Sequence, residues 1–378
     1  MKVALFYHSL VSDWNHGNAH FLRGISRELL SRGHEVRIFE PRDGWSRQNL
    51  VAEHGDRPLQ EFRLEFPELR STLYDPATVD VDAAVDGADL VLVHEWNDRD
   101  IVRRIGLCRA RSKRFRVLFH DTHHRSVTAP RSMAVYDLRH YDGVLAYGRV
   151  IAELYVERGW SRRAWTWHEA ADVRLFRPLL GRDRAGDVAW IGNWGDDERT
   201  AELREFLIEP ARELGLTGSA FGVRYPKEGR EALQAAGIAY RGWIANHHVP
   251  EVFARHAATV HVPRRPYVEA LPGIPTIRPF EAMACGIPLV VAGWRDTERL
   301  FSAGDDYLAV RTGREMVQCL RELLDNPDLA RRLAQHGRQT ILARHTCAHR
   351  VDELLAVASE LGIDDEQLAA GAVGRTAT

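Results

Sequence analysis

The chain has 378 residues, 45% of them hydrophobic, which is enough for two ordinary domains with a core each. Lys and Arg total 51 against 53 Asp and Glu, so the formal charge is −2 and no overall positive field exists to hold a nucleic acid or an anionic bilayer. This excludes a disordered chain and predicts no nucleic acid partner, while peripheral membrane contact stays open.

The apolar runs are too short for a membrane span. Residues 115–119 and 289–291 fall far below the roughly 20 apolar residues that cross a bilayer. The first residues reach His8 before an apolar signal-peptide core of about 7–15 residues can form. The four cysteines include no Cys-x-x-Cys pair, which is typical of reduced thiols and not of a structural zinc site. We therefore expect a cytoplasmic protein with no transmembrane segment and no obligatory metal.

Short apolar runs alternate with helix-period segments from the start, which is the pattern of a parallel sheet covered by helices. After a strand predicted at 3–7, apolar residues recur at helical spacing from Phe21 to Leu30, and Gly33 supplies a left-handed helix end. Further strands are predicted at 35–39, 90–93, 116–119, 143–146 and 164–167. These elements predict an N-terminal Rossmann-like domain over residues 1–178.

A loop at 179–186 has no apolar periodicity and marks the predicted domain boundary. Strands predicted at 188–191, 219–223, 238–240, 259–262, 289–291 and 307–310 then alternate with amphipathic helices, so a second Rossmann-like domain is expected over 179–345. Residues 316–362 predict consecutive helices broken near Asn326-Pro327 and near His345. The helix at 346–362 is expected to pack back towards the N-terminal domain, and residues 363–378 to form a flexible tail.

One segment carries a specific resemblance. Residues 275–288 read Pro-Thr-Ile-Arg-Pro-Phe-Glu-Ala-Met-Ala-Cys-Gly-Ile-Pro. This resembles the donor-site signature of GT-B glycosyltransferases, especially the retaining glycosyl transferases group 1 and their CgeB-type relatives. Residues 29–36, residues 168–178 and the helices from Asn326 onward occur in the order expected for that family. The resemblance implies an α/β GT-B fold, with two Rossmann-like domains facing a central cleft, and a nucleotide-sugar donor, a UDP-sugar or alternatively a GDP-sugar.

A nucleotide sugar presents a diphosphate and two ribose hydroxyls, so its site needs donors for phosphate and a carboxylate for the diol. A helix beginning near Thr276 would direct free N–H groups at the diphosphate, and Gly273 would leave the approach open. Arg278 and Glu281 share a helix face, so Arg278 is expected at the phosphates and Glu281 at the ribose. A structural ion pair is the alternative explanation.

The chain departs from the resembled families at one position. Those families often carry a second Glu eight residues before the one matched by Glu281, and Gly273 stands there. Glu269 is the nearest acidic candidate for the sugar hydroxyls, with a solvated loop charge as the alternative. Three other donor contacts are predicted in loops that follow strands, with turn chemistry or core packing as alternatives: Asn193, Arg224 and Trp243.

Polar residues also follow strands of the first domain. His120-Asp121-Thr122-His123-His124-Arg125 ends the strand at 116–119, where a histidine or an aspartate can orient or deprotonate an acceptor hydroxyl. The catalytic candidates are therefore His120, Asp121, His123 and His124, with a capped turn as the alternative. His94-Glu95-Trp96-Asn97 ends another strand and makes Glu95 an acceptor-side candidate.

The loop after the first strand carries Asn15-His16-Gly17-Asn18 directly before a helix. Gly17 and Asn18 are expected near the donor, because a small residue at a helix start lets a phosphate approach the backbone. His16 is expected on the acceptor side.

Together these residues predict a transferase that breaks the anomeric C–O bond and releases a nucleoside diphosphate. No suitable loop carries an Asp-x-Asp metal motif, so Arg278, Arg224 and helix amides are expected to stabilise the leaving group without a cofactor. The resemblance implies retention at the anomeric carbon. A nucleotide-sugar epimerase of the same architecture and a catalytically idle sugar-nucleotide binder stay open as alternatives. The acceptor, whether glycan, lipid, protein or small molecule, is not specified.

Overall fold

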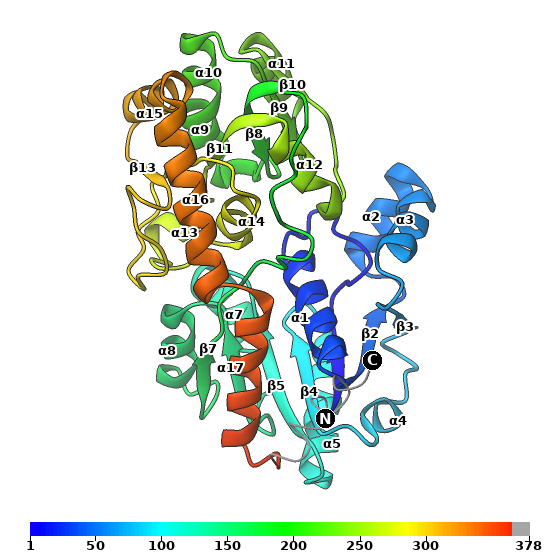
Figure 1. Ribbon diagram of the computed structural model, residues 1–378. Helices are drawn as coiled ribbons and strands as arrows, with labels where there is room; N and C mark the ends of the chain where they lie inside the picture. Colours follow the sequence, from blue (N-terminus) through cyan, green and yellow to red (C-terminus); the bar gives the residue numbers. More distant parts are fainter. Residues whose placement is uncertain (365–378) are drawn as a thin grey trace, which may run out of the picture. The chain divides into compact units, whose positions relative to one another are not determined.

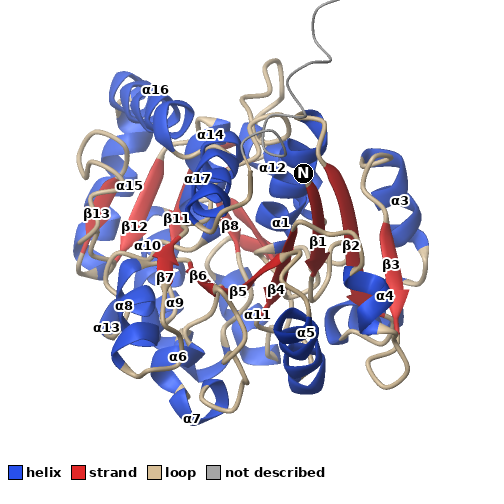
Figure 2. Ribbon diagram, turned by 90° about the horizontal axis from the view of Figure 1, so that it is seen from below, coloured by secondary structure: helices blue, strands red, loops and turns tan. Residues whose placement is uncertain are grey.

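The computed structural model describes residues 1–364 and divides into two compact units, each built on a parallel sheet (Figures 1 and 2). Unit 1 comprises residues 1–168 and the segment from Cys347 onward, and unit 2 comprises residues 169–346. The predicted α/β fold with two Rossmann-like sheets is confirmed. No helix within residues 1–364 is long and apolar enough to cross a membrane.

The sheet of unit 1 has seven parallel strands in the order β3-β2-β1-β4-β5-β6-β7. Its central strands are apolar and buried, as expected for a sheet covered on both faces. In chain order the strands are β1 (Lys2–Phe6), β2 (Glu35–Pro41), β3 (Ser71–Tyr74), β4 (Leu90–His94), β5 (Arg116–Asp121), β6 (Gly143–Ala146) and β7 (Ala164–Thr166). The edge strand β3 was not predicted.

Helix α1 (Ala19–Ser31) buries Phe21, Leu22, Ile25 and Leu29, which recur at helical spacing. Gly33 ends it at a φ of 80°, with the His34 N–H bonded to the Leu29 carbonyl, which confirms the predicted stop. The other helices of unit 1 are α2 (Trp45–His54), α3 (Arg57–Glu65), α4 (Val81–Val85), α5 (Arg99–Arg111), α6 (Arg125–Thr128), α7 (Pro130–Met133), α8 (Arg149–Glu157) and α17 (Cys347–Glu360).

The sheet of unit 2 has six parallel strands in the order β10-β9-β8-β11-β12-β13. Alternate residues of β8 enter separate clusters, Val188 and Trp190 in one and Ala189 and Ile191 in the other, so both faces of the sheet are buried. The strands are β8 (Gly186–Ile191), β9 (Gly218–Phe221), β10 (Ile238–Tyr240), β11 (His256–His261), β12 (Leu289–Ala292) and β13 (Leu308–Val310).

The helices of unit 2 include a π-helical turn, η2 (Arg204–Ile208), just before Pro210, whose missing N–H and bulky ring disrupt a regular α-helical turn. The two short 3₁₀ turns are η1 (Asp196–Glu198) and η3 (Asn246–His248). The α-helices are α9 (Thr200–Leu203), α10 (Glu209–Leu214), α11 (Lys227–Ala235), α12 (Val249–Ala254), α13 (Arg265–Glu269), α14 (Ile277–Cys285), α15 (Gly313–Asp325) and α16 (Pro327–Arg344).

The division between the units differs from the predicted boundary at 178/179. Ala171 and Phe176 are fully buried in a core cluster of unit 2, and the Ala171 N–H bonds the His345 carbonyl at 3.0 Å, so the segment after His168 belongs to unit 2. Helix α17 packs against α1 in unit 1 (Figure 1), and Arg32, directly after α1, pairs with Asp352 at 2.5 Å. The tail predicted at 363–378 lies outside the described residues from 365 onward.

Candidate functional site

Each sheet presents loops at the edge where its parallel strands end, which we call its carboxyl edge and which is where open α/β sheets bind ligands. In unit 2, loops 192–199, 222–226, 241–246, 262–276 and 293–299 follow β8, β9, β10, β11 and β12. The predicted donor residues of unit 2 lie in these loops or at the helices that begin in them, whereas Gly17 and Asn18 lie in unit 1. The N–H of Gly222 bonds the Gly242 carbonyl at 2.8 Å, so neighbouring loops of this edge support one another.

Arg199 lies at the centre of this edge and is only 8% exposed. Its Nη1 donates to the Val262 carbonyl at 3.0 Å and its Nη2 to the Asn193 carbonyl, while Nε makes no hydrogen bond within the described residues. Burial, followed by the charges of Arg264 and Arg278, lowers the pKa of Arg199 to about 9. The three guanidinium groups are therefore near enough to repel one another, and Arg264 reaches Glu198 at 3.2 Å. Such a group of cations favours an anion.

His261 ends β11 beside these arginines and is buried. Burial and then the charges of Arg199 and Arg278 lower the pKa of its imidazole to about 3, so the ring is neutral at pH 7. The positive charge of this edge therefore comes from the arginines.

Helix α14 begins directly after Thr276, which has a φ of 59° and a ψ of −179°. This conformation is strained for a β-branched residue, and such strain is concentrated at functional sites. Pro279 occupies the third helical position, where its missing N–H costs nothing. The helix thus begins where the sequence predicted, and the contact of its first amides with a diphosphate stays a prediction. Gly286 ends the helix in the left-handed conformation, as predicted.

Arg278 and Glu281 form an ion pair on α14, and Glu281 is fully buried. The second oxygen of Glu281 accepts a hydrogen bond at 3.3 Å from the side-chain amide of Asn246, which follows β10. The carboxylate is thus held by Arg278 of its own helix and by Asn246 from the segment after β10. The assignment of Glu281 to the ribose stays a prediction.

Gly273 has a φ of 92°, and a Cβ added there would lie 2.6 Å from Cγ and 2.9 Å from Oε1 of Glu298. The Gly273 N–H also bonds the Arg295 carbonyl at 2.9 Å, so the loop after β12 is built against it. The resembled families often carry a Glu at the position of Gly273. In this chain the Glu298 carboxylate lies beside that glycine. The sequence did not indicate Glu298, because the two positions are separated along the chain.

The other predicted donor residues have varied surroundings. The Asn193 side chain accepts from the Val223 N–H at 3.0 Å, which joins the loops after β8 and β9. Arg224 has a φ of 62° and pairs with Asp196 at 3.1 Å, about half exposed. Trp243 is half-buried, and Glu269 is exposed at the end of α13. Their contacts with a donor stay predictions.

In unit 1, four histidines gather at the ends of β1, β4 and β5. Successive ring centroids lie 5.3 Å apart from His8 to His16, 6.0 Å from His16 to His94, and 5.6 Å from His94 to His120. Burial lowers the pKa of His8 to about 4 and that of His120 to about 3, and lowers those of His16 and His94 well below the ordinary value. The cluster is therefore neutral at pH 7. Nε2 of His16 makes no hydrogen bond within the described residues.

Two buried carboxyl groups lie beside these histidines. Oε1 of Glu95 accepts from the N–H and hydroxyl of Thr122 at 3.2 and 3.1 Å, and Oε2 lies 3.5 Å from Nδ1 of His94. Burial and then Asp121 raise the pKa of Glu95 well above its usual range. Asp121 accepts from the His123 N–H at 3.1 Å, from the Tyr155 hydroxyl at 2.8 Å and from the Ser126 hydroxyl. These contacts make Asp121 an anchor of its loop, and its catalytic role stays a prediction.

The remaining predicted residues of unit 1 are His123 and His124 in the loop after β5, and Gly17 and Asn18 before α1. His123 and His124 stack at 4.0 Å between ring centroids, and Nδ1 of His124 bonds the Thr128 hydroxyl at 2.8 Å. Gly17 and Asn18 immediately precede α1, with Asn18 at the N-cap. The loop before them is held by Arg23, which pairs with Asp13 at 2.9 Å with both side chains buried.

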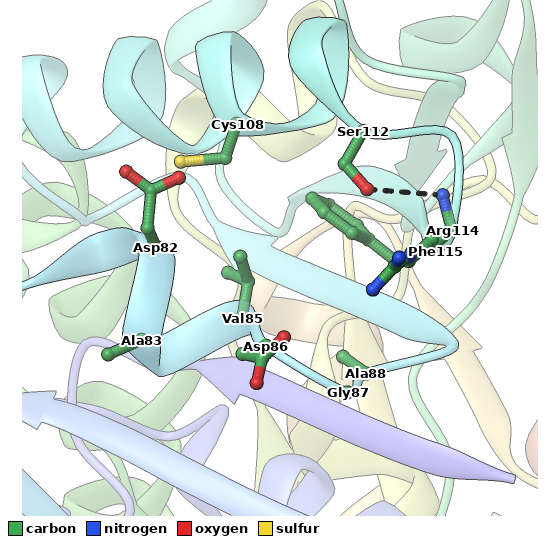
Figure 3. Close-up of a pocket in the computed structure, with 10 residues that line it drawn as sticks. All are labelled: Asp82, Ala83, Val85, Asp86, Gly87, Ala88, Cys108, Ser112, Arg114 and Phe115. Atoms are coloured by element: carbon green, nitrogen blue, oxygen red, sulfur yellow. Dashed lines mark hydrogen bonds between the residues drawn. The ribbon is translucent and has the colours of Figure 1, made fainter.

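A cavity of about 340 Å³ lies elsewhere in unit 1 (Figure 3). It is lined by α4, by Cys108 near the end of α5 and by the residues that precede β4 and β5, among them Ala88 and Phe115. It therefore opens at the amino ends of the strands, away from the carboxyl edge, and contains none of the predicted site residues.

Sequence reasoning missed several residues of these edges. Arg199 follows Asp196-Asp197-Glu198, and an arginine in such a charged segment suggests a solvent-exposed side chain. Its burial becomes visible only in the structure, where it packs against Trp190. Arg264 and His8 directly follow strand ends, so their positions could have indicated them.

Comparison with known proteins agrees with this geometry. Residues 199–356 match a family model described as glycosyl transferase-like, and no curated protein matches the sequence. An alpha-glucosyltransferase in complex with UDP and a 13-mer DNA is 12% identical with a TM-score of 0.66, covering 95% of this chain and 99% of that one. Sucrose-phosphate synthase from Thermosynechococcus elongatus is 16% identical with a TM-score of 0.64, covering 96% and 99%. HepE from Anabaena in complex with UDP-glucose is 13% identical with a TM-score of 0.67, covering 95% and 100%.

At these identities the solved structures show the shared fold, while the family model carries the class of activity. The resemblance drawn from residues 275–288 is thereby confirmed at the level of GT-B glycosyltransferases. The chain is therefore similar to glycosyltransferases: residues 199–356 match the glycosyl transferase-like family model, and the whole chain shares the GT-B fold of these solved structures.

Proposed function

We propose that the chain transfers a sugar from a UDP-sugar to an acceptor hydroxyl, without a metal ion and with retention at the anomeric carbon. The observation that carries the proposal is the group of Arg199, Arg264 and Arg278 at the carboxyl edge of unit 2. Solved structures of the same fold contain UDP or UDP-glucose, which supports UDP over GDP. One of them also contains DNA, but with a formal charge of −2 we expect no nucleic acid acceptor for this chain.

In this proposal the arginines and the first amides of α14 hold the diphosphate, so that negative charge is stabilised as the anomeric C–O bond breaks and UDP leaves. Glu281 orients Arg278 and contacts the ribose, and Glu298 or Glu269 contacts the sugar hydroxyls. The acceptor oxygen forms the new bond to the anomeric carbon and loses its proton. His123 or His124 accepts this proton, with Asp121 positioning their loop through its hydrogen bond from the His123 N–H.

The test is calorimetric titration of the full chain with UDP, GDP and ADP, followed by assays of UDP release from UDP-sugars with and without acceptors. UDP is expected to bind most tightly, and release is expected to depend on an acceptor and to persist in EDTA. Arg278→Ala should weaken UDP binding. Arg265→Ala should leave UDP binding unchanged, because Arg265 is exposed and paired with Glu202 at 3.0 Å. Failure of all three nucleotides to bind would contradict the proposal, and acceptor-independent conversion of the donor would favour an epimerase.

A further inference from the structure

Two tryptophans are exposed at the carboxyl edge of unit 1. Trp96 follows β4 and is 40% exposed, and Trp45 begins α2 after β2 and is 45% exposed. Strands β2 and β4 flank β1 in the sheet. The other large apolar side chains that are strongly exposed within residues 1–364 are aliphatic: Leu64, Val135, Val156, Leu180 and Leu342. The large exposed aromatic surface of the described chain is therefore confined to one edge of one sheet.

His8, two residues after the end of β1, lies between the segments that carry the two tryptophans. Gly44 directly precedes Trp45, and a Cβ at Gly44 would lie 3.4 Å from the His8 carbonyl oxygen. The His8 ring lies 6.1 Å from the Trp96 ring between centroids. The segments that carry Trp45, His8 and Trp96 thus follow one another along the edge, in the order of strands β2, β1 and β4.

Both indoles are held in place before any ligand binds. The Arg125 guanidinium lies 3.7 Å from the centroid of the Trp96 ring and donates to the Glu95 carbonyl at 3.1 Å. Trp45 packs edge-on against the buried Trp14 at 5.0 Å, and the Trp14 indole N–H donates to Glu53 at 2.8 Å. A rigid aromatic surface loses little conformational entropy when it binds a ligand.

The alternation of apolar planes with a hydrogen-bonding group selects a class of ligand. A pyranose ring has an apolar face of C–H bonds, which packs on an indole, and a rim of hydroxyls, which needs hydrogen-bond partners. A lipid chain would instead need continuous aliphatic surface, whereas here an imidazole adjoins the Trp96 indole and the His8 segment lies between the segments of Trp96 and Trp45. A nucleic acid would need a run of cations along its phosphates.

We propose that Trp96, His8 and Trp45 bind a saccharide acceptor, with one sugar ring on each indole and the imidazole contacting the hydroxyls between them. This rests on the proposed function, because a saccharide bound here is an acceptor only if the chain transfers sugars. The acceptor is then an oligosaccharide of at least two residues, and Trp96 and Trp45 determine its length preference.

The test uses the full chain with UDP-glucose, UDP-galactose or UDP-N-acetylglucosamine as donor. Maltotriose, cellotriose, chitotriose and mannotriose are the saccharide probes, and 4-nitrophenol and octanol the non-saccharide probes, with UDP release and product mass as readouts. The wild type should accept a trisaccharide, and Trp96→Ala should raise its KM about 10-fold, as expected for loss of one aromatic contact. Trp96→Phe should retain most of the affinity. Trp45→Ala should raise the KM of the trisaccharide more than that of the corresponding monosaccharide.

Leu64→Ala is the control, because Leu64 is the most exposed aliphatic side chain of unit 1, and its KM should equal that of the wild type. The inference is overturned if UDP binds but only 4-nitrophenol or octanol is glycosylated, if UDP binds and no probe is glycosylated, or if both Trp→Ala variants keep the wild-type KM for the trisaccharide. Absence of UDP binding by the wild type would instead remove the proposed function on which the inference rests.

Discussion

The two units share a strand order and differ in the chemistry of their carboxyl edges. Read from the third strand of each unit, both sheets run 3-2-1-4-5-6, and unit 1 adds a seventh strand. The edge of unit 2 carries three arginines, whereas the edge of unit 1 carries four histidines with lowered pKa values and two buried carboxyl groups. The same strand order thus forms an equivalent carboxyl edge in each unit, and the side chains at each edge determine what it can bind.

Burial acts on both edges, but the residues respond differently. A buried histidine escapes the cost of desolvation by staying neutral, as the pKa of about 3 for His120 indicates. An arginine stays charged at pH 7, so the cost of burying Arg199 persists until an anion compensates it. Unit 2 is thereby suited to a diphosphate and unit 1 to a neutral hydroxyl.

The largest effect is expected for the buried ion pair that shapes the edge of unit 1. Asp13→Ala leaves Arg23 charged and uncompensated, since both side chains are buried, and should lower the free energy of unfolding by about 3–5 kcal/mol. Urea unfolding measures this change. Glu68→Ala is the control, because Glu68 pairs with Arg27 where both side chains are partly exposed, and the change should stay below about 1 kcal/mol. Equal effects would mean that burial does not distinguish the two pairs.

The next effect tests the arginine group directly. Arg199→Ala should weaken UDP binding about 100-fold, because charge-assisted hydrogen bonds to the diphosphate are lost. Calorimetry measures the affinity, and thermal unfolding checks that the loops after β8 and β11, which Arg199 joins, remain folded. Wild-type affinity in a folded variant would remove Arg199 from the site.

A smaller effect separates the two roles of Glu281. If Glu281 contacts the ribose, Glu281→Ala should weaken the binding of UDP about 10-fold more than the binding of inorganic pyrophosphate, because pyrophosphate has no ribose. If Glu281 only orients Arg278, the affinities for both ligands should fall by the same factor. Competition binding with the two ligands measures the ratio, and equal loss would refute the ribose assignment.

A separate prediction concerns the pH dependence of stability. The folded-state pKa of His120, about 3, lies below the ordinary value of 6.5, so the unfolded chain binds the proton first. The contribution of neutral His120 to the free energy of unfolding is complete above pH 6.5. This contribution is lost as the pH falls towards 4, by about 1.4 kcal/mol per pH unit. The raised pKa of Glu95 acts in the opposite direction. Urea unfolding of His120→Phe should therefore show a shallower slope in this window, and an unchanged slope would contradict the neutral state of His120. His140→Phe, at an exposed histidine, is the control.

Much of the architecture followed from local patterns. Buried apolar runs predicted all strands except β3, because β3 is a four-residue edge strand that is only partly buried. Gly33 and Gly286 ended their helices where expected, since a left-handed residue is a local requirement. The position of polar residues after strands also indicated both carboxyl edges.

The sequence was sufficient for the fold class, for the order of all strands but β3, and for the segment at 275–288 that resembles the donor-site signature of GT-B glycosyltransferases. Only the tertiary structure decided which charges are buried, which are paired and which loops meet. It buried Arg199 on Trp190, engaged Asp121 with three neighbours and brought Glu298 to Gly273. The reason is physical: periodicity and helix capping act within a few residues, whereas desolvation and ion pairing depend on groups that only the folded chain brings together.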